Sequence, residues 1–229
     1  MFQKNNLKII NADCMDIMKN YEDNYFDLAI VDPPYGIGAD VKQNNAALSR
    51  IKAKGKSKSG RGWKLYESTN WDNEIPDENY FKELKRVSKN QIIWGGNYFT
   101  KFLNPSMGWL VWNKMQREFS LADGELAWTS YNKAIRIFDY SRGAALSNNN
   151  NNGGRFHPTQ KPVKLYEWIL KNYGDKDFKI LDTHLGSASS AIAAFYYGCK
   201  EFVGIELDKD YYNSSIKRIK KHTIQTKLF

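Results

Sequence analysis

Cysteine and histidine are scarce in this chain, and their scarcity argues against two kinds of site. Cys14 and Cys199 are its only cysteines, too few for a disulfide framework or a zinc site made of thiolates. The three histidines, His157, His184 and His222, do not have the spacing of metal ligands. We therefore expect a protein without a bound metal.

Long apolar runs are missing as well. No stretch reaches the roughly 20 apolar residues that a membrane-spanning helix needs. The first six residues lack the basic-then-apolar pattern of a signal peptide. We therefore expect a soluble, cytoplasmic protein, and 229 residues predict a single domain, 1–229, large enough to bury a substantial core.

Acidic residues are outnumbered, 25 against 34 lysines and arginines, and the resulting net charge of +9 favours a polyanionic partner. Many of the basic residues lie in 36–66, between glycines and serines and with few large apolar side chains. Such a stretch cannot bury enough surface to order itself, so we expect a mobile loop. It is either a solvated linker or a loop that binds phosphates.

The rest of the chain alternates between short apolar runs and amphipathic segments, which is typical of an α/β protein with a mainly parallel sheet and helices on both faces. We expect strands at 7–10, 26–31, 91–94, 108–113, 125–131, 134–140, 179–182 and 201–207. We expect helices at 15–21, 77–87, 162–173 and 188–197 and a last one after residue 208.

Four of the expected strands finish with an acid at the carboxyl end: Asp13, Asp32, Asp182 and Glu206. In open α/β sheets, ligands bind outside the carboxyl ends of the strands. Each acid alone could be a helix cap or a turn residue. Four acids meeting at one edge are costly unless a ligand supplies hydrogen-bond donors or positive charge.

The second of these strands leads directly into Asp32-Pro33-Pro34-Tyr35. The two prolines end the pairing and stiffen the backbone. A carboxylate and a proline carbonyl can accept the two protons of an exocyclic amine, while the Tyr35 ring stacks on a planar base. The plainer interpretation is an acidic turn after a strand.

The tetrapeptide Asp32-Pro33-Pro34-Tyr35 resembles the catalytic motif of S-adenosylmethionine-dependent DNA amino-methyltransferases, in the form typical of adenine-N6 enzymes. The catalytic half precedes the apparent cofactor loop, an order similar to that of the permuted β-class. The resemblance implies a Rossmann-like methyltransferase fold with a mostly parallel seven-stranded sheet. It covers most of the chain and is weakest at 36–66 and 141–156, where loops that contact DNA are expected.

The resemblance also implies a set of cofactor contacts. Asp182 through Ser187 is similar to the family's cofactor loop, and Glu206 follows where a carboxylate takes ribose hydroxyls. The loop's only glycine is Gly186, so the three-glycine fingerprint of NAD-binding proteins is absent. The residues implied to bind S-adenosylmethionine are Asp13, Cys14, Lys161, Asp182, His184, Leu185, Gly186, Ser187 and Glu206.

For two of these residues, the resemblance also implies which part of the cofactor they contact. Asp13, in a segment resembling the family's Gly-Asp-Cys, is implied to lie near the adenine of the cofactor. Lys161 and the neighbouring backbone, in His157-Pro158-Thr159-Gln160-Lys161-Pro162, are implied to hold its carboxylate end. The plainer interpretation of the hexapeptide is a loop that feeds a helix. Ala188 stands where the family usually has a second glycine. Its methyl group would act against cofactor binding, but alanine is small enough that we expect function to survive.

The partner implied is double-stranded DNA with the target base flipped out, because a base inside the duplex cannot reach the methyl group. The residues expected to contact DNA are Lys42, Arg50, Lys54, Lys56, Lys58, Arg61 and Trp63. Alternatives stay open. Cytosine N4 uses the same amine chemistry, though usually with Ser in place of Asp32, and RNA or protein-amide methylation usually has Asn there. A non-catalytic nucleic-acid-binding protein with this fold is the other class, and a homodimer is also open.

Overall fold

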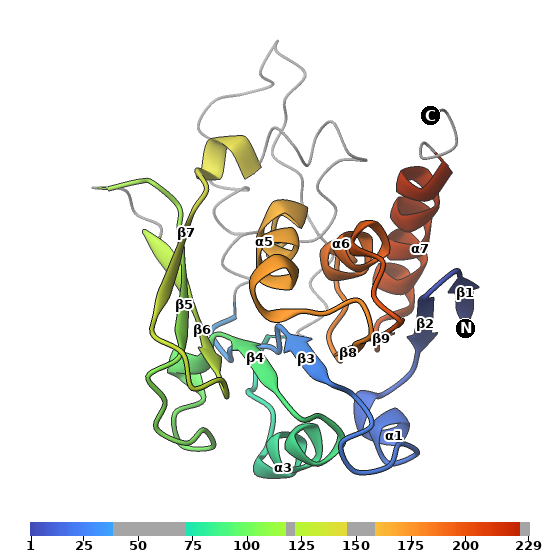
Figure 1. The fold of residues 1–229 in the computed structure, drawn as a ribbon, viewed down its shortest axis with the longest axis horizontal. Helices are drawn as coiled ribbons and strands as arrows, with labels where there is room; N and C mark the ends of the chain where they lie inside the picture. Colours follow the sequence, from blue (N-terminus) through green and yellow to red (C-terminus); the bar gives the residue numbers. More distant parts are fainter. Residues whose placement is uncertain (39–71, 118–121, 146–158, 225–229) are drawn as a thin grey trace.

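The computed structural model of the chain describes residues 1–38, 72–117, 122–145 and 159–224. Across these ranges, nine strands form one sheet in the order β1-β2-β9-β8-β3-β4-β6-β5-β7 (Figure 1). The strands are β1 (Phe2–Lys4), β2 (Leu7–Asn11), β3 (Leu28–Val31), β4 (Gln91–Trp94), β5 (Trp109–Asn113), β6 (Gly124–Thr129), β7 (Arg136–Asp139), β8 (Lys179–Asp182) and β9 (Glu201–Glu206).

The centre of the sheet is parallel. Strands β2, β9, β8, β3 and β4 pair in parallel in that order, while β6 is antiparallel to both β4 and β5. The α/β class and the mostly parallel sheet are confirmed. The expected number of seven strands is corrected to nine in the described residues, because β1 and β7 extend the two edges of the sheet.

Helices cover both faces of the sheet, which therefore has two cores (Figure 1). The helices are α1 (Cys14–Met18), α3 (Glu78–Val87), α5 (Val163–Tyr173), α6 (Ser189–Tyr197) and α7 (Lys209–Ile224), with a short 3-10 helix η1 (Gly96–Tyr98) after β4. The first is shorter than the expected 15–21. Helices α5, α6 and α7 contribute to one core, and α1 and α3 to the other.

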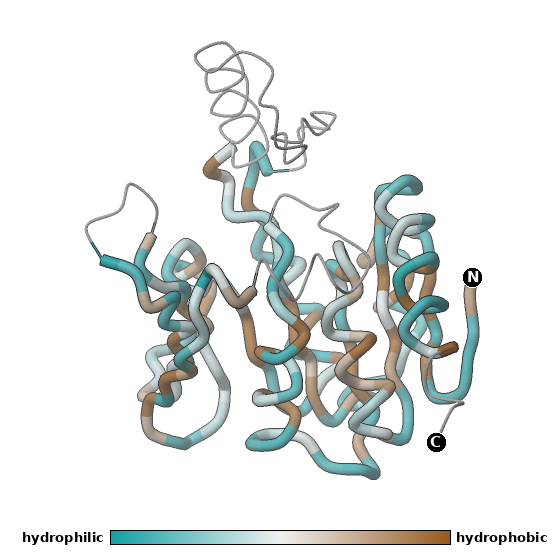
Figure 2. Tube along the Cα trace, turned by 90° about the horizontal axis from the view of Figure 1, so that it is seen from above, coloured by the Kyte–Doolittle hydropathy of each residue, from teal (hydrophilic) through white to brown (hydrophobic). Residues whose placement is uncertain are grey.

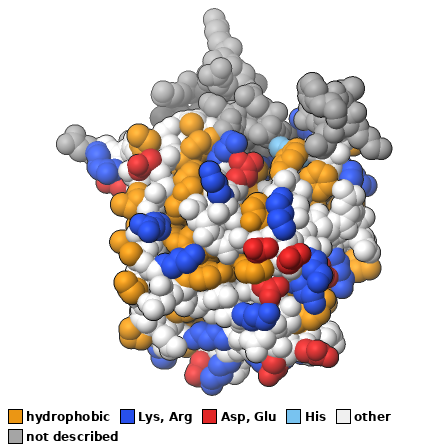
Figure 3. All heavy atoms as spheres, in the orientation of Figure 1, with side chains coloured by type: hydrophobic (Ala, Val, Ile, Leu, Met, Phe, Trp, Pro, Cys, Tyr) orange, Lys and Arg blue, Asp and Glu red, His pale blue; other side chains and the backbone are white. Residues whose placement is uncertain are grey.

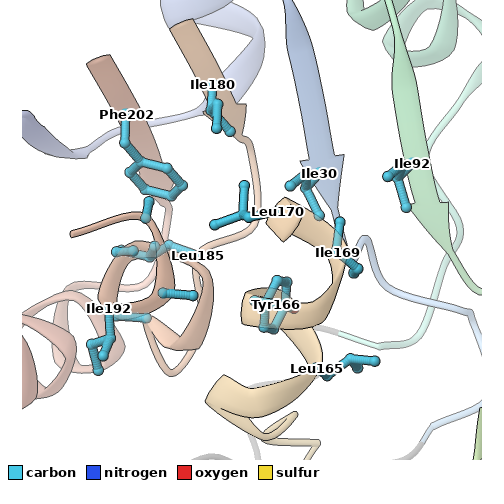
Figure 4. Packing of buried hydrophobic residues seen from close by; sticks show 14 of the residues in the cluster. Ile30, Ile92, Leu165, Tyr166, Ile169, Leu170, Ile180, Leu185, Ile192 and Phe202 are labelled. Carbon is cyan, nitrogen blue, oxygen red and sulfur yellow. The ribbon is translucent and has the colours of Figure 1, made fainter. Parts of the chain in front are cut away.

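Strand β3 shows how a continuous apolar run supplies both cores. Successive side chains of a strand point to opposite faces. Leu28 and Ile30 therefore join the α5–α6–α7 core, while Ala29 and Val31 join the α1–α3 core. Figure 4 shows Ile30 beside Ile169 of α5 within the first core. All four β3 residues are almost fully buried, so the position of the strand, and of the turn that follows it, is strongly fixed.

Local signals set the helix boundaries. The Asp77 side chain caps α3 by accepting a hydrogen bond from Tyr80 N at 3.0 Å. Gly198 ends α6 with a left-handed φ of 74°, a conformation that costs glycine little. In Figure 2 the hydrophobic stretches lie within the layered part of the molecule and polar residues dominate the surrounding loops.

The strand order changes direction between β8 and β3. The chain goes from β8 to β9 on one side and from β3 to β4 on the other. Such a switch point leaves a crevice at the carboxyl ends of the two central strands. Within the described ranges, no helix has the length and apolarity to span a bilayer, and no cluster of three or more His, Cys, Asp or Glu side chains could hold a metal ion.

Candidate active site at the carboxyl edge of the sheet

A cavity of about 340 Å³ lies at the carboxyl ends of the parallel strands. Its volume falls in the range of small-molecule sites. Three of the four strand-end acids, Asp13, Asp32 and Glu206, line it, and so does Gly186. The turn after β3 and the loop after β8 therefore face the same space, which is the condition for both to act on one reaction.

The Asp32 carboxylate, at the end of β3, is held by two other side chains. Tyr35 OH donates to Oδ1 at 2.6 Å, and Lys161 Nζ donates to Oδ2 at 2.5 Å. Lys161 Nζ also lies 3.1 Å from Tyr35 OH. Each carboxylate oxygen has two lone pairs, so Asp32 keeps acceptor capacity for a group in the cavity.

Lys161 connects Asp32 to a second carboxylate, Glu125 of β6. Lys161 Nζ lies 3.1 Å from Glu125 Oε2, and Lys114 Nζ lies 2.7 Å from Glu125 Oε1. Burial raises the pKa of Asp32, and Lys161 opposes this rise. Burial acts in the same direction on Glu125, but the ammonium groups of Lys161 and Lys114 hold its pKa at about 2.

This position differs from the one expected for Lys161. The sequence implied that Lys161 and the neighbouring backbone would hold a carboxylate of the cofactor, but the Lys161 side chain is 3% exposed and its ammonium group is already bound to Asp32 and Glu125. Its backbone carbonyl accepts a hydrogen bond from Ser189 Oγ at 2.7 Å. Although burial lowers the pKa of Lys161, the two carboxylates outweigh it and raise the pKa, so the side chain is a cation.

The Tyr35 ring is packed on residues from the β4 end rather than facing the cavity. Tyr98 stacks on it at 5.0 Å between centroids and 16° between planes, and Pro34, not Tyr35 or Pro33, lines the cavity. A Cβ on Gly95 would lie 2.2 Å from the ring. The expected role of Tyr35 as a stacking platform therefore differs from its contacts, which make it a support for Asp32.

Gly95 is a site residue that the sequence did not reveal, and Gly95→Ala tests it. Its φ of 72° strains any side chain, and the added methyl group must displace the Tyr35 ring from Asp32. We expect the free energy of unfolding to fall by about 2 kcal/mol. Chemical denaturation measures it. Gly143→Ala, where a Cβ meets nothing within 4 Å, is the matched control, and equal stability of the two variants would contradict the prediction.

The loop between β8 and α6 is held by two of the strand-end acids, Asp182 and Glu206. Asp182 Oδ1 accepts a hydrogen bond from His184 N at 3.0 Å, and its Oδ2 accepts one from Ser190 Oγ. Glu206 Oε2 accepts one from Gly186 N at 2.8 Å. Asp182 does not line the cavity, so it shapes the loop from behind, whereas Glu206 both supports the loop and faces the cavity.

Burial changes the ionisation of this loop. It raises the pKa of Asp182 and of Glu206, each to about 7, against the opposing effect of their hydrogen bonds. It lowers the pKa of His184 to about 4 and raises that of Cys14 to about 12, so both are neutral near pH 7. The two acids are therefore the groups at this end of the site that titrate near neutrality.

Ala188 does not reach the cavity. It is fully buried in the core formed with α5, α6 and α7 and has a left-handed φ of 61°. Its methyl group lies among apolar side chains instead of in the cavity lining. The expected steric effect on a cofactor therefore has no geometric support, and the extra methyl group is instead a source of backbone strain.

Gln160 lines the cavity with an unsatisfied amide. The residue is 9% exposed, and neither Nε2 nor Oε1 has a hydrogen-bond partner among the described residues. A buried amide without partners is costly, so a molecule in the cavity that offered a donor and an acceptor would be stabilised there.

All implied cofactor residues except Asp182 line the cavity. The lining residues not singled out from the sequence are Ala12, Thr159, Gln160, Tyr166, Thr183, Ser189, Leu207, Asp208 and Tyr211. Ala12, Thr159 and Gln160 belong to segments already compared with the family, and that comparison could have found them. Tyr166 follows a helical apolar period and resembles an ordinary core residue.

The residues expected to contact DNA lie outside the described residues. This holds for Lys42, Arg50, Lys54, Lys56, Lys58, Arg61 and Trp63. Of the two expected loops, only 36–38 and 141–145 are described.

Comparisons with known proteins agree with this geometry. Residues 111–217 match the family described as DNA methylase. The type II methyltransferase M2.MboI of Moraxella bovis is 22% identical over 240 residues, covering 93% of this chain and 87% of its own length. The type II methyltransferase M.HpaI of Haemophilus parainfluenzae is 25% identical over 252 residues, covering 93% of this chain and 74% of its own.

Solved structures share the fold. The crystal structure of an M1.HpyAVI–SAM complex has a TM-score of 0.55 at 19% identity and covers 93% of this chain and 98% of that one. The PvuII DNA methyltransferase, described as cytosine-N4-specific, has a TM-score of 0.59 at 13% identity, covering 97% and 92%. The resemblance stated from the sequence is confirmed, and Asp32 lies outside the matched range 111–217.

Proposed function

We propose that this chain is a DNA methylase of the family whose description matches residues 111–217, and that it transfers a methyl group from S-adenosylmethionine to N6 of a flipped-out adenine in DNA. The observation that carries the proposal is the shared cavity: Asp32 after β3 and Gly186 and Glu206 around the β8 loop line one space. The adenine choice rests on Asp in the first position of the tetrapeptide.

The cavity suits S-adenosylmethionine in three respects. Glu206 can accept hydrogen bonds from a ribose diol while Gly186 lets the backbone approach closely. The Gln160 amide, which has no hydrogen-bond partner in the described part of the chain, offers both a donor and an acceptor. The acids around the cavity complement the positive charges of the ligand.

When bound, S-adenosylmethionine supplies an electrophilic methyl group. The adenine amine is a weak nucleophile because its lone pair is delocalised into the ring. The Asp32 carboxylate, which lines the cavity, accepts one of its protons, which favours a pyramidal nitrogen and compensates the charge that develops on it. The Pro33 carbonyl is the expected acceptor of the other proton, although Pro33 does not line the cavity of the free protein. Tyr35 and Lys161 hold Asp32 in position for this contact. No covalent bond to the protein is needed.

The unpaired Gln160 amide gives a test in which stability and binding move in opposite directions. Gln160→Leu removes a costly buried amide, so we expect the free protein to gain about 1 kcal/mol in unfolding free energy. The same change should weaken S-adenosylmethionine binding about tenfold, because the cofactor loses a hydrogen-bonding partner. Thermal unfolding and titration calorimetry measure the two effects.

A matched control is Gln91→Leu, in which the lost amide is buried but satisfied, since Gln91 Nε2 donates to Ser88 O at 2.6 Å. This variant should lose stability and keep its affinity. Unchanged cofactor binding by Gln160→Leu would refute the assignment of its amide to the ligand.

The function is tested by incubating the protein with labelled S-adenosylmethionine and mixed-sequence duplex DNA, followed by modification-sensitive sequencing. We expect N6-methyladenine at one short motif. N4-methylcytosine would refute the adenine choice and retain the amine chemistry. On the face seen in Figure 3, basic and acidic side chains of the described residues are interspersed, so DNA contact rests on the sequence and on this assay.

Titration calorimetry separates the enzyme from a non-catalytic DNA-binding protein. The enzyme should bind S-adenosylmethionine with a measurable heat in the absence of DNA. DNA binding without any heat from the cofactor would favour the non-catalytic alternative.

A further inference from the structure

The Asp32 carboxylate lies at one end of a row of alternating charges, in which Lys161 is buried and the other side chains are partly buried. From Asp32 the row runs to Lys161, then to Glu125 and finally to Lys114, with nitrogen–oxygen distances of 2.5, 3.1 and 2.7 Å. The members come from four separate places in the chain: the turn after β3, the segment before α5, strand β6 and the end of β5. Such a row requires the whole fold to form.

The central ammonium group has little access to solvent that could replace its partners. The Lys161 side chain is 3% exposed, and its Nζ lies 5.3 Å from the centroid of the Trp94 ring and 5.6 Å from that of Tyr35. Aromatic faces favour a cation and fix its position. Without this ammonium, the partly buried Asp32 and Glu125 would share one region with no positive charge between them, and ionisation of both would be disfavoured.

We propose that Lys161 is a positioning residue that keeps the Asp32 carboxylate ionised and oriented toward the amine of the target base. Glu125, the other carboxylate bound to Lys161, sets how strongly the ionised form of Asp32 is favoured. The proposal rests on the proposed function, because it assumes that Asp32 receives an amine proton in a hydrogen bond. A protonated Asp32 would carry a hydrogen on one oxygen and lose acceptor capacity and charge.

The geometry gives the two neighbours of Asp32 opposite effects. Lys161 is the cation nearest to Asp32 and lowers its pKa, whereas Glu125 is a nearby anion and raises it. The other titratable groups that interact with Asp32 are Tyr35 of its own turn, Tyr80 of α3, Tyr166 of α5 and Asp182 of β8. Burial raises the pKa of these three tyrosines well above 10, so Asp182 is the one that can titrate near neutrality.

The test is the pH profile of kcat for methyl transfer by the intact protein and three variants. The acidic limb is the part of the profile in which kcat falls as the pH is lowered. Lys161→Met should move this limb to higher pH by about one unit or more and reduce kcat about tenfold at pH 7. Glu125→Gln, nearly isosteric, should move the limb to lower pH. Lys161→Arg keeps the charge and should leave the limb in place. A merely structural role would lower kcat equally at every pH.

A readout without catalysis keeps this inference separate from the proposed function. The pH dependence of thermal unfolding of the free protein also reports the ionisation of Asp32. Lys161→Met and Glu125→Gln should shift this pH dependence, and the shifts should disappear when the same substitutions are made in an Asp32→Asn background. If the parent protein transfers no methyl group, the proposed function fails, and the unfolding curves still decide the coupling between Lys161 and Asp32.

Failure of one variant to fold does not remove the test, because Glu125→Gln retains the Lys161–Asp32 pair. A limb and an unfolding profile that stay fixed in Glu125→Gln, or move to higher pH, would overturn the proposal. So would a folded Lys161→Met with the parent's pH profile.

Discussion

Asp32→Ala is expected to reduce methyl transfer about a thousandfold or more, equivalent to about 4 kcal/mol of transition-state stabilisation. The carboxylate lines the cavity, is fixed by Tyr35 and Lys161, and retains lone pairs for an amine. Its interaction with the amine strengthens as positive charge develops on the nitrogen, so its loss affects the transition state more than the ground state. Single-turnover transfer to DNA, with saturating S-adenosylmethionine, measures the effect.

Two further variants define what Asp32 does. Asp32→Asn keeps the shape but replaces one acceptor oxygen by a donor, so we expect a loss of about a hundredfold. Asp27→Asn, just before the other end of β3, is the matched control, because Asp27 bonds to Lys89 and the backbone of Lys179 outside the cavity. Transfer by Asp32→Ala at the parent rate, with the fold intact, would remove Asp32 from the mechanism.

The positions of the turn at Asp32 and of the loop between β8 and α6 could be predicted from the sequence because their signals are local. Asp32 and the two prolines directly follow a buried strand. In a parallel α/β sheet, residues in that position lie at the carboxyl edge. The same reasoning placed Asp13, Asp182 and Glu206 at that edge, where the structure has them at the ends of β2, β8 and β9.

The residues that support the site could not be predicted in this way. Glu125 is 93 positions from Asp32 in sequence and reaches it only through Lys161, by way of the antiparallel strand β6. Gly95 matters because the Tyr35 ring lies against it, which is a tertiary contact without a sequence pattern. Asp182 was expected to contact the cofactor, but its hydrogen bonds to His184 N and Ser190 Oγ direct its carboxylate toward the loop between β8 and α6 and away from the cavity.

Glu206→Gln is expected to weaken S-adenosylmethionine binding about fiftyfold, the effect of losing hydrogen bonds to a charged group. Glu206 has backbone donors on both oxygens, Gly186 N at 2.8 Å and Asp208 N at 2.9 Å. The amide of glutamine would set a donor against one of these N–H groups and remove the charge that attracts ribose hydroxyls. Glu201→Gln, the same change at the opposite end of β9, should leave the affinity unchanged, as its carboxylate accepts from Tyr25 OH away from the cavity.

Glu206 also predicts a pH dependence with opposite signs for affinity and stability. Burial raises the pKa of Glu206 from 4.5 to about 7. Between pH 4.5 and pH 7, the Glu206 carboxyl group is therefore mostly protonated in the free folded protein and mostly ionised in the unfolded chain. The free energy of unfolding should therefore fall as pH rises through this window. Cofactor binding favours the ionised carboxylate, so affinity should rise about tenfold between pH 6 and pH 8.

Titration calorimetry at pH 6, 7 and 8 decides whether Glu206 is the group responsible. Asp182 also has a pKa raised by burial to about 7, but its oxygens are bonded to His184 N and Ser190 Oγ and it does not line the cavity. The pH dependence of affinity should therefore be nearly flat in Glu206→Gln and unchanged in Glu201→Gln. A slope that persists in Glu206→Gln would assign the titration to Asp182 and show that the ligand is sensed through the shape of the loop instead of by direct contact with Glu206.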